Sequence, residues 1–357
     1  MNINWNPMLG VKTASLATTL GLSNVFSKVA IAQQGADERV RPFEEQPYNL
    51  DFSFFDGPMT TISGLTEWSQ HINEVYGITT YIVAFIFFAV AIPIIFTIIK
   101  FRAKPGQEKV VPKQVSGNHT LEIIWTAIPV ILLIFIAVPT MQIIFKEAKP
   151  VPADALKVEV IGHQWWWEFR YPDHNVTTGG ELYLPEDTDI AYHISSVDVI
   201  HSFWVPIFGG KVDALPGEVN VKSFKTPKLD PKFAETGKLY QGQCAELCGP
   251  SHALMRFQVR LVSKEMFQKY LEIYNEPPVV ATSKEKLGEE QFAKCMACHA
   301  ISGTMSAQIP GEKLGPNLSN FGNRAMLAGG TRPNKYNHLV SWIKAPDSIK
   351  PGSLMPR

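Results

Sequence analysis

The sequence predicts a multidomain membrane protein in three parts: a hairpin of two transmembrane helices, an antiparallel β sandwich and a small all-α domain. Two long runs without charged residues, 75–99 and 123–145, predict the hairpin. Short alternating apolar segments follow from about Leu156, and helical periodicity returns towards the C-terminus. The 357 residues suit such a division, because ordinary domains take about 100–200 residues each.

Residues 1–32 are predicted to be a secretory signal peptide. Lys12 opens a weakly apolar segment rich in small residues, which ends in the A-x-A pattern Ala30-Ile31-Ala32. We expect cleavage after Ala32. A disordered tail is the alternative, because polar residues interrupt the apolar segment. Residues 33–75 then form an exported N-terminal segment, with a short helix expected over 64–76.

The two charge-free runs predict transmembrane helices over residues 76–100 and 121–146. A helix needs about 20 apolar residues to cross the hydrocarbon core. The loop between them, residues 101–120, is basic: Lys100, Arg102, Lys104, Lys109 and Lys113 stand against Glu108 alone. By the positive-inside rule this loop is cytoplasmic. We therefore expect a chain embedded in the lipid bilayer of a bacterial inner membrane, with both its N-terminus and its C-terminal domains periplasmic.

Charge and cysteine usage limit the possible functions. The chain has 33 basic and 33 acidic residues, so no basic excess attracts nucleic acid, and we expect no nucleic-acid partner. Its four cysteines form two close pairs, Cys244 with Cys248 and Cys295 with Cys298. Close pairs indicate two separate sites more than a disulfide framework.

The β sandwich is predicted over residues 155–263. Alternating segments such as 158–161 and 256–262 are separated by Gly and Pro turns, which is typical of sandwiches and barrels. Residues 264–284 are predicted to be a helix and a linker. The all-α domain follows over residues 285–357, with helices expected at 285–297 and 335–344.

One stretch, QCAELCGPSHALM (243–255), gathers soft and borderline metal ligands. A turn of the chain could direct Cys244, Cys248, His252 and Met255 at one centre, and copper prefers such a set. A disulfide is the alternative that an exported domain suggests, but the neighbouring His and Met favour a metal. Two thiolates that bridge a pair of copper ions need a second terminal nitrogen, for which His201 is the candidate.

From the first membrane helix through Leu261, the chain resembles subunit II of the haem–copper cytochrome c oxidases. The matching motifs are GHQWWWEF (162–169), VIHSFWVP (199–206), KVDALPGEVN (211–220) and QCAELCGPSHALM (243–255). The resemblance implies a cupredoxin-like sandwich with a dinuclear copper A centre. The implied ligands are His201, Cys244, Cys248, His252, Met255 and the backbone carbonyl of Glu246.

The same resemblance implies roles for three further side chains. Glu246 would reach a magnesium ion shared with subunit I, although a solvated glutamate is the alternative. Trp165 would receive electrons, whereas Trp166 and Trp167 are expected to pack in the sheet. Glu122, at the cytoplasmic end of the second span, would form the entrance of a proton channel into subunit I, or would simply lie at the membrane boundary.

The second cysteine pair lies in a C-x-x-C-H motif at residues 295–299. In this motif Cys295 and Cys298 fix a haem through thioethers and His299 is an axial ligand, although a redox disulfide or half a zinc site are alternatives. The second axial ligand is expected to be Met355, which would raise the haem potential. Its competitors are Met305 and Met326.

The segment from about Leu287 resembles class I cytochrome c. In that family a proline carbonyl, here that of Pro316, orients the axial histidine. The family's last helix should follow Met355, so we expect the haem domain to continue beyond Arg357.

Together the two resemblances predict subunit II of a respiratory oxidase with a fused cytochrome c domain, the caa-type arrangement. Electrons would pass from cytochrome c or another donor through haem c and copper A to the haems of subunit I. Oxygen is reduced there and protons are translocated, with subunit III as a further partner. Two alternatives are a copper-binding assembly or storage protein and a quinol oxidase subunit II, which shares the fold but lacks the copper ligands.

Overall fold

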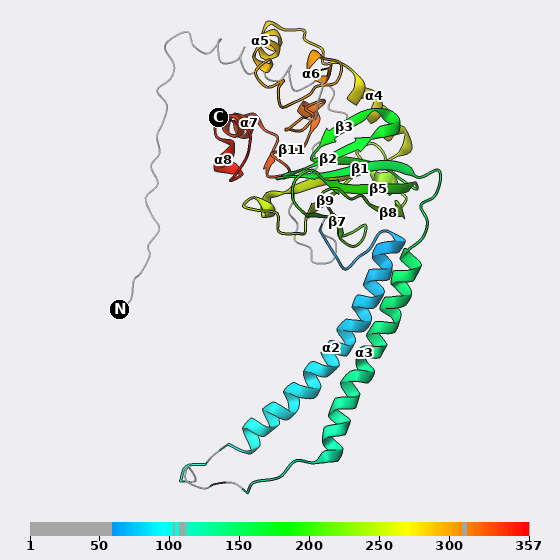
Figure 1. Cartoon of the computed structure of the whole chain (residues 1–357), viewed down its shortest axis with the longest axis vertical. Coiled ribbons are helices and arrows are strands. Elements are labelled where there is room, and N and C mark those ends of the chain that lie inside the picture. The colour runs from blue at the N-terminus through cyan, green and yellow to red at the C-terminus, as the bar shows by residue number, and fades with distance from the viewer. Residues whose placement is uncertain (1–58, 103, 107–110, 112, 309–312, 357) are drawn as a thin grey trace, which may run out of the picture. The chain divides into compact units, whose positions relative to one another are not determined.

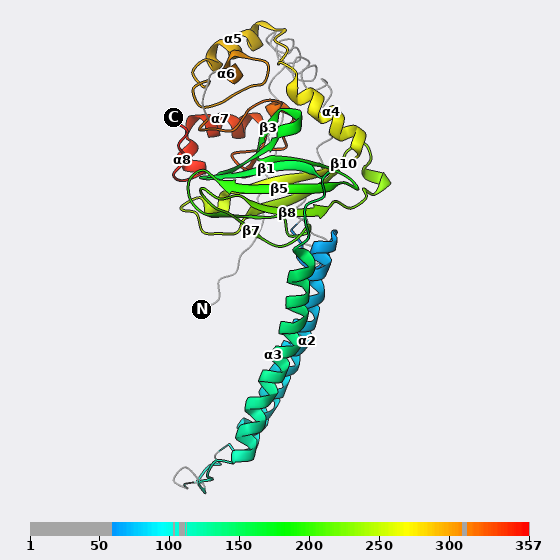
Figure 2. The same cartoon turned by 45° about the vertical axis from the view of Figure 1, so that its right-hand side comes forward.

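A computed structural model describes residues 59–102, 104–106, 111, 113–308 and 313–356 (Figures 1 and 2). The predicted signal peptide and the exported segment up to residue 58 lie outside these residues. The described part contains two long helices, a two-sheet sandwich and a C-terminal group of short helices. These elements confirm the predicted fold class. A cytochrome c fold for the C-terminal group stays a prediction.

Two helices form the membrane hairpin, α2 (Glu67–Lys100) and α3 (His119–Glu147). Both are long and apolar enough to cross a membrane. They lie side by side in both views (Figures 1 and 2). The short helix expected before the first span is not separate, because α2 runs through it from its N-cap Thr66. Their apolar side chains are largely exposed, which suits contact with lipid or another membrane subunit.

The described strands after α3 build two five-stranded sheets. One has the order β3-β2-β1-β5-β8 and the other β4-β10-β9-β6-β7. Their bounds are β1 Leu156–His163, β2 Trp166–Tyr171, β3 Val176–Gly179, β4 Glu181–Pro185, β5 Asp189–Ser196, β6 His201–Trp204, β7 Val212–Ala214, β8 Asn220–Lys225, β9 Lys238–Cys244 and β10 Arg256–Val262.

Most neighbouring strands pair antiparallel, as predicted, but β1 with β5 and β10 with β4 are parallel. The difference arises where the chain changes sheet. After β3 the chain crosses to the other sheet as β4 and returns as β5, which then runs beside β1 in the same direction. Parallel neighbours need such a crossover, and local alternation of apolar residues does not reveal it.

Aromatic side chains fill the space between the two sheets. Trp167 is fully buried and packs edge-on against Phe203 and Phe257, with ring centroids 5.3 and 5.9 Å away. Phe203 and Phe257 stack on each other at 4.8 Å. Trp166 points to the opposite face of β2, where it is half-buried and stacks on His163 at 4.0 Å. Such pairs stabilise beyond the area they bury, so β2, β6 and β10 are held firmly beneath the loops that follow.

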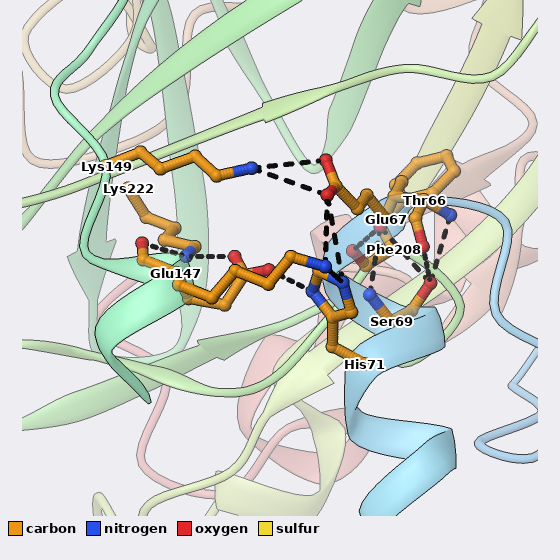
Figure 3. Close-up of polar contacts among 9 residues, drawn as sticks. Thr66, Glu67, Ser69, His71, Glu147, Lys149, Phe208 and Lys222 are labelled. Carbon is orange, nitrogen blue, oxygen red and sulfur yellow. Dashed lines mark hydrogen bonds and ion pairs between the residues drawn. The ribbon is translucent and has the colours of Figure 1, made fainter. Parts of the chain in front are cut away.

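A polar cluster joins the hairpin to the sandwich (Figure 3). His71 of α2 and Glu147 at the end of α3 approach to 2.6 Å between Nδ1 and Oε1. Lys222 of β8 donates to the same carboxylate at 2.8 Å. The hydroxyl of Thr66 donates to the carbonyl of Phe208 at 2.6 Å. These contacts fix the position at which both helices leave the sandwich.

The chain after β10 first forms α4 (Lys264–Asn275), whose Tyr270 stacks on Tyr183 at 3.8 Å. The C-terminal elements are α5 Ser283–Phe292, α6 Met305–Gln308, the hairpin of β11 Met326–Leu327 and β12 Arg332–Pro333, α7 Tyr336–Lys344 and α8 Pro346–Ile349. The helix expected at 335–344 is α7. The one expected at 285–297 ends earlier, because the backbone turns at Cys295 into the C-x-x-C-H motif.

Candidate metal centre

Two thiols lie at the end of the sandwich, where β9 ends. Cys244 is the last residue of β9 and Cys248 lies in the loop after it, and both are buried. Their Sγ atoms are 3.8 Å apart, whereas a disulfide holds its sulfurs about 2.05 Å apart. Both cysteines are free. The geometry is therefore that of two separate sulfur ligands.

Each thiol has its own imidazole. His201, the first residue of β6, is fully buried and places Nδ1 3.8 Å from Sγ of Cys244. His252 places Nδ1 3.6 Å from Sγ of Cys248. The ligand atoms of His201, Cys244 and Cys248 all lie within 4.8 Å of one another.

Two further donors close the group. Sδ of Met255 is 3.8 Å from Sγ of Cys248, and the carbonyl oxygen of Glu246 is 3.3 Å from Sγ of Cys244. The structure thus brings together every ligand expected from the sequence. We call these the copper ligand set: His201, Cys244, Cys248, His252, Met255 and the carbonyl of Glu246. Soft sulfur and imidazole donors of this kind suit copper.

The two thiols share a proton. The hydrogen bond between them lowers the pKa of Cys244 to about 3 and raises the pKa of Cys248 well above its usual value. The hydrogen bond therefore favours a thiolate at Cys244 and a protonated thiol at Cys248. Because ligands bind metals as thiolates, a cation bound here would displace the second proton.

Asp198 orients His201 and was not found by sequence reasoning. Its Oδ1 accepts from Nε2 of His201 at 2.8 Å, so Nδ1 keeps its lone pair on the side of Cys244. Asp198 also accepts the backbone N–H of Gln164 at 2.6 Å. Gly162 lies against the same ring, and a Cβ there would come within 2.7 Å of its Cδ2. The sequence feature that could have revealed Asp198 is its place three positions before His201, a candidate ligand.

Trp165 lies against the copper ligand set. Its indole Nε1 donates to the carbonyl of Cys248 at 2.9 Å, and the side-chain amide of Gln164 donates to the same oxygen at 2.7 Å. Only 7% of Trp165 is exposed. The C-terminal segment covers it, because a Cβ on Gly352 would lie 2.6 Å from the indole Cη2.

Glu246 and Glu122 are more open. The side chain of Glu246 is exposed at the surface of the ligand loop. Glu122 lies in the first turn of α3, with its carboxylate 3.6 Å from Nδ1 of His119 and half of its side chain exposed. Both carboxylates are accessible from outside the chain, and their roles stay predictions.

The C-x-x-C-H motif forms a tight turn. The N–H groups of Cys298 and His299 both donate to the carbonyl of Cys295, at 3.1 and 2.9 Å. Nδ1 of His299 lies 2.8 Å from the carbonyl of Pro316. A carbonyl can only accept, so Nδ1 carries the proton and Nε2 keeps the lone pair. This tautomer and the two free thiols fit covalent haem attachment with axial ligation by Nε2.

The three candidate methionines differ in environment. Met305 is 72% exposed, Met326 is buried in β11 and Met355 is half-buried in the loop after α8. An axial ligand must be shielded from water and yet belong to a loop that can reach the haem face. Met355 is partly shielded and lies in a loop, and its axial role stays a prediction.

Fold and donor set together define a class: membrane-anchored β-sandwich proteins with a soft-metal site in the loops at one end. Family models for the cytochrome c oxidase subunit II transmembrane domain and periplasmic domain match residues 63–143 and 176–262. Cytochrome c oxidase subunit 2 of Bacillus subtilis is 40% identical over 272 residues, which cover 73% of this chain and 75% of that one. The chain belongs to the cytochrome c oxidase subunit II family.

Two further similar proteins are a second bacterial relative and a solved periplasmic domain. Cytochrome c oxidase subunit 2 of Alkalihalophilus pseudofirmus is 38% identical over 267 residues, which cover 72% of this chain and 73% of that one. A crystal structure of the periplasmic domain of subunit II of cytochrome oxidase from Bradyrhizobium japonicum aligns with a TM-score of 0.31 and 32% identity, covering 34% of this chain and 95% of that one. As a member of the cytochrome c oxidase subunit II family, the chain is a membrane subunit of a haem–copper terminal oxidase, and subunit I is its partner.

Proposed function

We propose that this chain carries electrons through two metal groups of its own: a covalently bound haem c and a dinuclear copper A centre. Cys295, Cys298 and His299 hold the haem, with Met355 as the second axial ligand. The copper ligand set holds the copper pair. Electrons arrive from cytochrome c or another donor and leave for the haems of subunit I, where oxygen reduction is coupled to proton translocation.

The observation that carries the copper proposal is the pairing of donors. Two sulfurs lie 3.8 Å apart and each has an imidazole of its own, Cys244 with His201 and Cys248 with His252. A mononuclear electron-transfer copper site uses a single thiolate, so this doubled set would suit two copper ions. It also argues against a quinol oxidase subunit II, which lacks these ligands.

When bound, the copper pair supplies a one-electron carrier. The chain contributes by fixing the positions of the donor atoms and by shielding them from water. Met255 is fully buried, and Trp167 packs edge-on against the ring of His201 at 5.9 Å. An apolar shell around fixed ligands tunes the potential and limits rearrangement when the charge changes.

The haem proposal is supported by His299 and Pro316. The carbonyl of Pro316 fixes the imidazole so that Nε2 faces away from it. A methionine such as Met355 as second ligand raises the haem potential, which suits an electron carrier placed before copper. The bound haem would supply a one-electron carrier, held by Cys295, Cys298 and His299.

The remaining proposals concern other subunits and the membrane. The exposed side chain of Glu246 is suited to a magnesium ion shared with subunit I, because that hard cation prefers oxygen ligands. Glu122 is suited to the entrance of a proton channel into subunit I. Subunit III completes the assembly. We place the chain in a bacterial inner membrane, with the sandwich and C-terminal segment on the periplasmic side.

Spectra of three full-length proteins test the proposal. The unmodified chain, loaded with copper and haem, should show the near-infrared band of a mixed-valence copper pair and a haem that survives denaturation. Cys244→Ser should lose the band and keep the haem, whereas Cys295→Ala should weaken covalent haem attachment and keep the band. An unmodified chain that binds copper without a near-infrared band would refute the dinuclear assignment.

A further inference from the structure

The C-terminal segment lies directly on the loop of the copper ligand set. Ser251, beside His252, donates its hydroxyl to the carbonyl of Pro351 at 2.7 Å. The backbone N–H of Arg256 donates to the carbonyl of Gly329 at 3.1 Å, and Thr331 donates its hydroxyl to the carbonyl of Leu254 at 3.2 Å. Two short stretches, 328–331 and 350–352, therefore cover this loop.

Lys350 lies at the centre of this contact and is 4% exposed. Its Nζ donates to the carbonyl of Trp165, in the sandwich, and to the carbonyl of Ala328 at 3.1 Å. In the described part of the chain, no carboxylate forms an ion pair with it, and its hydrogen-bond acceptors are backbone carbonyls. Burial lowers its pKa to about 7. Burial of an ammonium group is costly, and the two carbonyl oxygens that accept from Nζ offset part of that cost.

Trp165 joins both sides of the contact. Its carbonyl accepts from Lys350 and its ring lies against Gly352, while its indole N–H donates to the carbonyl of Cys248. Gly352 is three residues before Met355, the predicted axial ligand. One tryptophan thus lies between a loop of the copper ligand set and the loop that carries the predicted haem ligand.

We propose that Lys350 is a positioning residue for electron transfer within the chain. It fastens the Met355 loop to the backbone of Trp165 and thereby fixes the distance and orientation between the haem-binding segment and the copper ligand set. This inference rests on the proposed function. The step itself moves one electron from haem iron to the copper pair, and Lys350 neither gains nor loses an electron in it.

A second anchor allows Lys350 to be tested by itself. Arg324 donates to the carbonyl of Gly179 at 3.0 Å and to the hydroxyl of Tyr274 at 2.7 Å, and Glu181 accepts the N–H of Ala325 at 2.8 Å. These bonds hold the C-terminal segment to β3, β4 and α4, far along the chain from Lys350. Loss of the Lys350 amine should therefore loosen the Met355 loop without releasing the whole segment.

The test uses Lys350→Met, which keeps the length of the side chain and removes both hydrogen bonds. In the full chain loaded with copper and haem, a soluble ruthenium polypyridyl complex photoreduces the haem, and near-infrared absorbance reports arrival at copper. We expect roughly a tenfold or greater fall in the transfer rate, because small displacements of reacting groups cost large factors in rate. The haem and copper spectra should stay unchanged. Lys344→Met, an exposed lysine in α7, should transfer at the unmodified rate.

A second readout needs neither metal. In the metal-free full chain, hydrogen exchange at the amide of Arg256, which donates to Gly329, should be faster in Lys350→Met than in Lys344→Met. Gly352→Ala should also slow the transfer and speed exchange at the Arg256 amide, with Lys350 intact, because the added Cβ would displace the loop from the indole of Trp165. If Lys350→Met fails to fold, Gly352→Ala still tests whether the position of the Met355 loop controls the transfer rate.

The outcomes separate the two proposals. If the loaded, unmodified chain shows neither the near-infrared copper band nor the haem spectrum, the proposed function is contradicted. If both spectra are present and the transfer rate is unchanged in Lys350→Met and Gly352→Ala, the positioning role is overturned. The proposed function then stays intact. Altered spectra together with a slower rate also overturn it, because they would show a structural effect on the metal sites.

Discussion

Asp198 illustrates how a residue that is no ligand controls a metal site. It accepts the Nε2 proton of His201 and so leaves Nδ1 for the metal. It is itself held by the N–H groups of Gln164 and Val199, at 2.6 and 2.7 Å. Burial would raise the pKa of Asp198, but its hydrogen bonds outweigh burial and lower it, so the carboxylate is charged at neutral pH.

Replacing Asp198 should therefore weaken copper binding without removing a ligand. In Asp198→Asn the ring of His201 loses its charged acceptor and is free to turn or to change tautomer. We expect copper affinity to fall about 10–100-fold, as is usual when such an outer partner is lost. Competition with a chromophoric chelator measures it. Asp213→Asn, an exposed position on β7, is the control, and equal affinities in the two variants would contradict the role.

At the scale of residues, the sequence revealed the members of the copper ligand set more readily than the residues that hold them in place, such as Asp198 and Lys350. Cys244, Cys248, His252 and Met255 were predictable because ligand types recur there within a dozen positions. His201 lies far from them in the sequence, and we identified it only because a pair of copper ions needs a second nitrogen ligand. Lys350 was not predictable, because a lysine becomes buried only through contacts made by distant backbone carbonyls.

At the scale of elements, the joint between hairpin and sandwich depends on three segments that meet only in the folded chain. Glu147 ends α3, His71 lies in the first turns of α2 and Lys222 lies on β8. The ammonium of Lys222 also lies 4.5 Å above the ring of Trp68. Apolar periodicity predicted both helices, but it could not predict this cluster (Figure 3), because polar residues carry no periodic signal of their partners.

Removing Lys222 should loosen this joint. Its side chain is 15% exposed and that of Glu147 is 17% exposed, so the hydrogen bond between them is largely shielded from water. In Lys222→Met we expect the free energy of local opening to fall by about 2 kcal/mol, the usual cost for a hydrogen bond to a charged group. Hydrogen exchange at the amides of residues 145–148, at the end of α3, should then be about thirtyfold faster.

The matched control for the joint is Lys225→Met on the same strand. Lys225 pairs with Asp187 where both side chains are well exposed, and such pairs contribute little to stability. Exchange at the amides of residues 145–148 should be unchanged in this variant. If Lys222→Met and Lys225→Met exchanged at the same rate, the polar cluster would not be what holds the hairpin.

At the scale of the whole molecule, the order of the parts was predictable, whereas their contacts were not. Charge-free runs, alternating strands and the helical C-terminal pattern each leave a local trace, and the fold class followed from them. The crossover that makes β1 and β5 parallel leaves no local trace. Nor does the cover over Trp165, which brings residues near 350 against a residue almost two hundred positions earlier.

This arrangement gives Trp165 a definite place in the proposed function. It contacts a loop of the copper ligand set through its indole and the Met355 loop through its carbonyl and ring. With 7% of its surface exposed, an external protein has little of it to contact. We therefore propose the chain's own C-terminal segment as the electron donor to Trp165.

Transient absorption of the unmodified full chain, loaded with copper and haem, tests this account most directly. After photoreduction of the haem, its reoxidation should coincide with bleaching of the near-infrared copper band, one electron for one electron, at a rate independent of chain concentration. Such first-order transfer is what a haem segment docked on Trp165 predicts. A reduced haem that stays reduced, or a rate that rises in proportion to chain concentration, would contradict it.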